Sequence, residues 1–350
     1  MTILFAILLF SFLIFIHELG HFLAAKASGV RVNEFAMFMG PAIFKKQVGE
    51  TLYSLRCIPI GGYCAMEGEN EDTDDPHSFQ KAAWWKRLII LVAGSFMNFV
   101  AGLLIFAIVF APAKQLVVSV IESAETGCTV IREDGLHVGD EIIAMDGEKI
   151  YVQSDFSTIL YLNPGDTHDI TVKRNGEKLV FNDYKMEKHL FPGEETERYG
   201  FSFSVADATF GNKLVYVWNS ALNVVRNVRL SLQMMFTGQA GLSDMTGPVG
   251  IVQIMSDTAE ASPTVLDAVL NVLYIGGFLA INLAVMNLLP IPALDGGRVV
   301  GLLLTVAIEK IIRKKLDAKY EGYIHGIGMI LLLTLMAVIL FKDIFIIFMR

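Results

Sequence analysis

Residues 3–25 read ILFAILLFSFLIFIHELGHFLAA, an apolar run whose ionisable residues, His17, Glu18 and His21, all lie in its second half. As a helix rising 1.5 Å per residue, this run would be about 35 Å long, which is enough to cross the roughly 30 Å hydrocarbon core of a bilayer. No basic segment precedes the run, and no small-residue cleavage site follows it. We therefore expect a retained membrane helix rather than a signal peptide that is removed.

The composition points to a membrane protein as a whole. Hydrophobic residues make up 53% of the 350 residues and charged residues 18%, and the mean hydropathy is +0.51. Three further apolar runs have spanning length, at 88–111, 265–289 and 327–348. We expect a polytopic α-helical protein with four transmembrane helices in a lipid bilayer. The net charge of −8, with no run rich in lysine and arginine, argues against a nucleic-acid partner.

The polar stretches divide the chain into four expected parts. Residues 1–111 form an N-terminal membrane part, 112–200 an inserted β-rich domain, 201–264 a linker with interfacial helices, and 265–350 a C-terminal membrane part. Residues 212–237 have amphipathic helical spacing, and two central arginines favour a helix on the membrane surface over a fifth span. Three cysteines at uneven spacing indicate neither a disulfide framework nor a cysteine zinc site.

Charge in the short connections predicts the orientation in the membrane. Residues 26–87 and 295–325 are rich in lysine and arginine, so the positive-inside rule places them in the cytoplasm. Residues 112–264 and both termini are then outside. Within the first cytoplasmic loop, residues 34–66 alternate apolar and polar side chains around glycine turns, which is typical of β-strands.

The inserted segment carries a recognisable pattern at residues 135–150, GLHVGDEIIAMDGEKI. It combines tight glycine turns with a short apolar strand, and further strands are expected at 168–174 and 178–185. This pattern resembles a PDZ domain, a fold that binds extended peptides along a sheet edge. The preceding ETGCTV at 125–130 matches the glycine-rich carboxylate loop of such domains poorly.

The HELGH motif carries the expected chemistry. His17 and His21 lie four residues apart on one helical face, so both imidazoles can reach a single metal ion. Glu18 lies beside that face, where it can take a proton from an attacking water. Three ionisable residues within a membrane helix are costly unless they are paired, bind a metal or face a cavity. A functional metal site is therefore favoured over a chance match.

A catalytic zinc ion needs a third protein ligand, and Asp295 is the candidate at the right depth. It follows the third span in NLLPIPALDGGR (287–298), where Pro290 and Pro292 break the helix. An interfacial helix cap is the alternative reading of this aspartate. The remaining histidines lie in polar loops, in the inserted domain or at the entrance of the last span: His77, His137, His168, His189 and His325. In the second run, Gly94 and Asn98 lie four residues apart, where a neighbouring helix could pack closely.

Taken together, HELGH, GGYCAMEGE at 61–69, the PDZ-like insert, TGPVGI at 246–251 and NLLPIPALDGG resemble the site-2 protease family. More specifically, they resemble its bacterial RseP-like branch with a single PDZ domain. The resemblance implies that His17, His21 and Asp295 bind Zn²⁺ and that Glu18 is the general base. It places Asn287 near the bound substrate. The 34–66 loop resembles the family's membrane-reentrant β-hairpin, and the resemblance implies that this loop clamps the substrate. The substrate-contacting residues expected on this basis are Gly61, Gly62, Tyr63, Asn287, Pro290 and Pro292.

The activity implied by the resemblance is regulated intramembrane proteolysis in the bacterial cytoplasmic membrane. A zinc-dependent endoprotease would cleave the transmembrane segments of single-span proteins, such as anti-sigma factors or remnant signal peptides, with its active site toward the cytoplasm. Two other classes remain open, namely a non-catalytic adaptor with a structural metal and a metal transporter. A structural zinc site normally has four protein ligands, and a transporter would have ionisable residues along several spans.

Overall fold

The computed structural model describes residues 2–69, 73–193, 195–241, 245–313 and 319–349. Two compact units are present, one comprising Met1–Phe106 with Asn227–Arg350 and the other Ala107–Arg226. Each unit is considered separately below.

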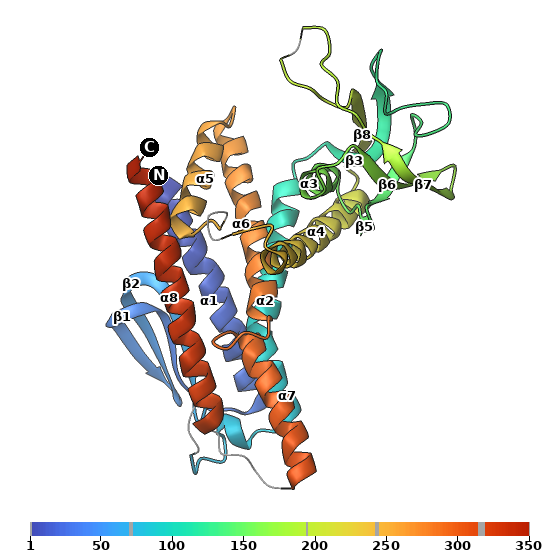
Figure 1. Cartoon of the computed structure of the whole chain (residues 1–350). Coiled ribbons are helices and arrows are strands. Elements are labelled where there is room, and N and C mark those ends of the chain that lie inside the picture. Colours follow the sequence, from blue (N-terminus) through green and yellow to red (C-terminus); the bar gives the residue numbers. More distant parts are fainter. Residues whose placement is uncertain (1, 70–72, 194, 242–244, 314–318, 350) are drawn as a thin grey trace. The chain divides into compact units, whose positions relative to one another are not determined.

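Four long helices of the first unit correspond to the four apolar runs. They are α1 (Thr2–Ser28), α2 (Trp84–Phe110), α6 (Val265–Asn287) and α8 (Lys319–Met349) (Figure 1). Each contains a segment that is long and apolar enough to cross a membrane, at Leu4–Ser28, Trp84–Phe110, Val265–Asn287 and Gly326–Asp343. The described part of the chain therefore contains four helices that are long and apolar enough to be the expected membrane helices.

Helices α1 and α2 approach closely because glycines line their contact. A methyl group placed on Gly20 would lie 2.4 Å from the carbonyl oxygen of Ala93 and 2.9 Å from the Cα atom of Gly94. Small residues allow the backbones of membrane helices to touch in this way. The contact places the helical face that carries HELGH directly against α2.

Two shorter helices of this unit are α5 (Pro248–Glu260) and α7 (Asp295–Ile312). The side chains of Ala6, Leu9, Met255 and Val272 form a core shared by α1, α5 and α6. The first turn of α5, within TGPVGI, also meets α8, because the N–H of Gly250 donates to the buried carboxylate of Asp343 at 3.1 Å. A single 3-10 turn at Phe79–Lys81 precedes α2.

Residues 32–66 form the predicted β-hairpin, with strands β1 (Val32–Val48) and β2 (Thr51–Met66) paired antiparallel. One face of the hairpin contributes Val32, Phe35, Cys64 and Met66 to a core that includes α1 and α2 side chains. Strand β2 also follows α1 toward the middle of that helix, since the Oγ atom of Ser11 donates to the Pro59 carbonyl at 3.1 Å.

The second unit is built on an antiparallel sheet with strand order β7-β6-β4-β3-β8, in which the short β5 pairs with β4. The elements are β3 (Gln115–Ala124), β4 (Glu141–Met145), β5 (Glu148–Lys149), α3 (Ser154–Leu162), β6 (Thr167–Arg174), β7 (Glu177–Lys185) and β8 (Phe201–Asp207). Strand β8 pairs with β3 and begins after residue 200, so the sheet extends past the range of the expected inserted domain. The core includes Ile121, Leu136, Ile142, Met145 and Ile170.

The buried carboxylate of Asp140 in this unit is paired with an arginine. The Arg174 side chain donates through two nitrogens to the Asp140 carboxylate, each at 2.7 Å. Burial of Asp140 raises the pKa of its carboxyl group, but the hydrogen bonds from Arg174 and from the His137 N–H outweigh it, so that this pKa lies below its usual range. Paired and hydrogen-bonded in this way, the carboxylate remains ionised inside the domain.

Helix α4 (Phe210–Thr237) coincides with the amphipathic stretch expected from the sequence, and it is not among the candidate membrane helices. Its Arg226 lies 2.8 Å from the buried carboxylate of Asp155 and donates to the Lys149 carbonyl at 2.5 Å. Asn223 contacts the same carboxylate. This arginine is therefore paired with groups of the β domain.

Candidate metal centre

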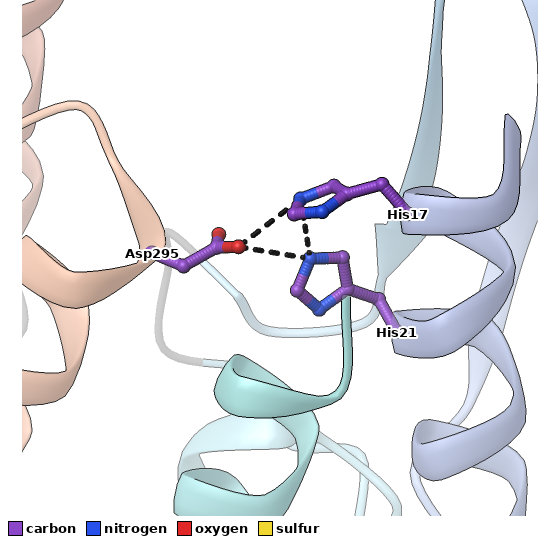
Figure 2. Close-up of side chains that lie close together, drawn as sticks. All are labelled: His17, His21 and Asp295. Atoms are coloured by element: carbon purple, nitrogen blue, oxygen red, sulfur yellow. Dashed lines mark hydrogen bonds and ion pairs between the residues drawn. The ribbon is translucent and has the colours of Figure 1, made fainter. Parts of the chain in front are cut away.

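Three side chains from two helices converge in the first unit (Figure 2). His17 and His21 come from α1, and Asp295 is the first residue of α7. The Nε2 atoms of the two histidines are 3.2 Å apart, and the Asp295 Oδ2 lies 3.1 Å from His17 Nε2 and 3.2 Å from His21 Nε2. Within the described residues, no other three histidine, cysteine, aspartate or glutamate side chains come close enough to hold a metal ion together.

The geometry of this triangle fits a tetrahedral zinc ion. Zinc bonds to imidazole nitrogen and carboxylate oxygen are about 2.0–2.2 Å long, so two ligand atoms of a tetrahedron are about 3.3–3.6 Å apart. The three edges observed, 3.1–3.2 Å, are only slightly shorter. The Asp295 Oδ2 is buried and has no hydrogen-bond partner among the described residues. Lone pairs facing one another in a buried site indicate that a cation belongs between them.

The orientation of His21 is fixed by the backbone of α2. The Nδ1 atom of His21 lies 2.8 Å from the carbonyl oxygen of Ile90. A carbonyl can only accept, so Nδ1 carries the proton and the Nε2 lone pair points toward the triangle. The corresponding Nδ1 atom of His17 faces two side chains, since it lies 3.5 Å from the Nδ2 atoms of both Asn98 and Asn287.

Gly94 allows α2 to pass directly beneath the imidazoles. A methyl group on Gly94 would lie 2.4 Å from Nε2 of His21 and 2.8 Å from Cε1 of His17. Gly94 and Asn98, which the sequence suggested only as a packing pair, thus both adjoin the candidate ligands. The sequence showed that these two residues share one face of a helix, but it did not show that this face meets His17 and His21.

The chain between α6 and α7 is folded tightly around Asp295. Helix α6 ends at Asn287, before the two prolines, and α7 begins at Asp295. Ala293 has a φ of +86°, a conformation that costs energy for a residue other than glycine. A methyl group on Gly296 would lie 2.2 Å from the Leu288 carbonyl oxygen, and one on Gly297 would lie 2.3 Å from that of Ile291. The two glycines therefore allow the backbone to turn back on itself and hold the aspartate in place.

The hairpin lies against the other side of the HELGH helix. A methyl group on Gly62 would lie 3.6 Å from Cγ of Glu18 and 3.0 Å from the carbonyl oxygen of Ala36. Gly61 has a φ of +80°. The Tyr63 hydroxyl accepts a hydrogen bond from Arg56, which also pairs with Glu34. Of the three hairpin residues expected to contact substrate, Gly62 is thus the one placed next to the candidate base.

The remaining expected residues are distributed around the site. Asn287 adjoins His17, as described above, whereas Pro290 and Pro292 are exposed in the connecting loop. Arg298, one turn into α7, forms an ion pair with Glu69 of GGYCAMEGE and so links α7 to the segment after the hairpin. Four other histidines have partners elsewhere and do not join the cluster, namely His77, His137, His168 and His189.

Comparison with known proteins identifies the family of this chain. Residues 5–335 match the model of peptidase family M50. A Clostridium perfringens protein, "Putative zinc metalloprotease CPE1693", is 36% identical over 98% of both chains. "Zinc metalloprotease RasP" of Shouchella clausii is 29% identical, and "Regulator of sigma-W protease RasP" of Bacillus subtilis is 26% identical, each over 98% of both chains. The chain is a member of peptidase family M50, the site-2 protease family of metalloproteases, and Zn²⁺ is its expected cofactor.

Proposed function

We propose that this protease hydrolyses peptide bonds within the transmembrane segments of single-span membrane proteins. The observation that carries the proposal is the position of the metal centre. His17 and His21 lie inside Leu4–Ser28, a helix segment suited to cross a membrane, and the connection after another such helix, Val265–Asn287, brings Asp295 to them. A cluster of this kind would meet a substrate at bilayer depth.

The residues divide the chemistry among them. His17, His21 and Asp295 would hold zinc and leave its fourth position open, as in catalytic rather than structural sites. Zinc bound there would polarise the scissile carbonyl and make the attacking water more acidic. Glu18 accepts the proton of that water and passes it to the leaving amine. We assign to the Asn287 amide, which lies 3.5 Å from His17 Nδ1, a hydrogen bond donated to the substrate carbonyl.

A helical substrate must be unwound before cleavage, because its carbonyls are engaged in hydrogen bonds four residues along the chain. The β1–β2 hairpin supports a solution to this problem. Its second strand runs beside α1 from Ser11 to Glu18, and a two-stranded sheet offers free edges. An unwound substrate segment added as a further strand would keep its backbone hydrogen-bonded beside the base. This is the role we infer for the hairpin as a membrane-reentrant element.

Anti-sigma factors and remnant signal peptides are the substrate classes we propose. For both classes, the bond to be cut would lie within a single apolar span. The name of the Bacillus subtilis relative, a regulator of sigma-W protease, supports the first class.

Cleavage by the purified full-length protein would test this function. Reconstituted with zinc in vesicles, the wild type is expected to cut a single-span substrate at a bond inside its span, mapped by mass spectrometry. Asp295→Asn should lose both zinc and cleavage, because an amide oxygen is a much weaker zinc ligand than a carboxylate. A cut confined to the soluble flanks of the substrate would contradict the intramembrane proposal. Retention of full zinc by Asp295→Asn would remove this residue from the metal site.

We further propose that the β1–β2 hairpin faces the cytoplasm and that the PDZ-like unit lies outside. Single cysteines at the exposed positions Lys81 and Thr126, in a chain with Cys57 and Cys128 changed to serine, would report the two sides. Thr126→Cys should react with a membrane-impermeant maleimide in intact cells, whereas Lys81→Cys should react only after lysis. The opposite labelling pattern would reverse the orientation.

A further inference from the structure

We propose that Asn98 is a positioning residue of the metal centre, whose amide oxygen accepts the Nδ1–H of His17 and so directs the Nε2 lone pair of His17 at the metal. The inference rests on the proposed function only in assuming that His17 is a zinc ligand. It assigns to a side chain of α2 the task that the Ile90 carbonyl performs for His21.

The first step is the protonation of His17. A neutral imidazole carries one proton, and a ring that binds metal through Nε2 must carry it on Nδ1. Nε2 of His17 is the atom that lies 3.1 Å from Asp295 and 3.2 Å from His21. Nδ1 is therefore a hydrogen-bond donor in a largely buried site, and it requires an acceptor.

The second step is the orphaned oxygen of Asn98. This side chain is 1% exposed, its Nδ2 lies 3.5 Å from His17 Nδ1, and its Oδ1 is buried without a partner among the described residues. The Asn98 Nδ2 amide and the His17 Nδ1–H are both hydrogen-bond donors, so they cannot form a hydrogen bond with each other. A half-turn about the last side-chain torsion exchanges the two amide atoms, which are equivalent in shape, and places Oδ1 beside the His17 Nδ1–H. One rotation thus satisfies a buried acceptor and a buried donor together.

The third step separates Asn98 from Asn287, which lies at the same distance from His17 Nδ1. Asn287 is partly exposed at the end of α6, so its amide can be satisfied by water or substrate. Asn98 is buried, so its amide oxygen cannot accept a hydrogen bond from bulk water or from the substrate. We therefore assign Asn98 to His17 and leave the Asn287 amide free to serve the substrate.

Zinc affinity is the readout, because it can be measured without any substrate. Full-length variants in detergent would be titrated against a chelator that competes for zinc, with the melting temperature of the zinc-free protein recorded in parallel. Asn98→Leu keeps the approximate volume but has no acceptor, so zinc should bind about 10–100-fold more weakly. Asn98→Asp keeps an acceptor and should stay within a few fold of wild type. Ser95→Ala is the matched control, since Ser95 is an equally buried polar residue of α2, and it should bind zinc normally.

The results that would overturn the assignment are distinct from failure of the proteolytic function. Wild-type zinc affinity in Asn98→Leu would refute it, as would an affinity of Asn98→Asp as weak as that of Asn98→Leu. Loss of affinity in Asn287→Ala alone would transfer the role to Asn287. If Asn98→Leu does not fold, Asn98→Ala gives the same comparison with a smaller side chain. The expected series of zinc affinities without cleavage of any span would leave the assignment intact and remove only the proposed activity.

Discussion

Replacing Glu18 by glutamine is expected to lower the rate of peptide-bond cleavage by about 10²–10⁴-fold, the usual contribution of a positioned general base, while zinc remains bound. Glutamine has nearly the same shape as glutamate but cannot accept a proton at neutral pH. Glu18 is not one of the three converging ligand residues, so the metal site should survive the change. Zinc content by mass spectrometry and the initial rate on a single-span substrate measure the two effects separately.

A matched variant shows whether the loss of cleavage is specific to Glu18 or follows from the loss of any nearby carboxylate. Glu67→Gln removes a carboxylate at the end of the hairpin, where Glu67 accepts a hydrogen bond from Asn33 at 2.7 Å. This variant should cleave within a few fold of the wild-type rate. A Glu18→Gln protein that cleaves normally would exclude Glu18 as the base. One that loses zinc would instead give Glu18 a part in holding the metal centre together.

The convergence of His17, His21 and Asp295 was predictable because each of these residues lies in a recognisable local pattern of the sequence. His17 and His21 lie one helical turn apart, so their meeting follows from helix geometry alone. Asp295 is some 270 residues away, but two prolines interrupt the apolar pattern just before it and mark irregular backbone at the end of a span. Asp295 was therefore preferred as the third ligand, because its expected depth in the membrane matches that of His17 and His21, whereas the other histidines lie in polar segments.

Contacts made by α2 and by β8 could not be predicted in the same way. Which face of α2 meets HELGH depends on the close contact of Gly20 with Ala93, and Ala93 belongs to no motif that would mark it as the partner. The role of Asn98 beside His17 depends on that contact. Strand β8 pairs Asp207 with Gln115, across a separation in the chain too long for hairpin signals to reveal. These features arise from tertiary packing.

Gly94→Ala is the second change from which we expect a large effect, a loss of zinc affinity of more than about 100-fold, which exceeds the usual cost of removing an outer partner of a metal ligand. The added methyl group would lie 2.4 Å from Nε2 of His21, the atom assigned to the metal. Either α2 must withdraw or the imidazole must turn away. Alanine also favours helix over glycine by about 1 kcal/mol, so weakening of α2 itself cannot cause the loss.

Gly102→Ala separates damage to the metal centre from damage to helix packing. Gly102 lies on the same helix, and a methyl group there would lie 2.4 Å from Cγ1 of the buried Ile281 on α6, a β-branched side chain with little freedom to rotate, so the clash strains the packing of α2 against α6. This variant should lower the melting temperature and keep wild-type zinc affinity, whereas Gly94→Ala should lose zinc whatever its melting temperature. Equal losses of zinc in both variants would attribute the effect to helix packing. Zinc binding by Gly94→Ala at the wild-type affinity would show that α2 does not confine the histidines, and it would weaken the case that Asn98 on the same helix positions His17.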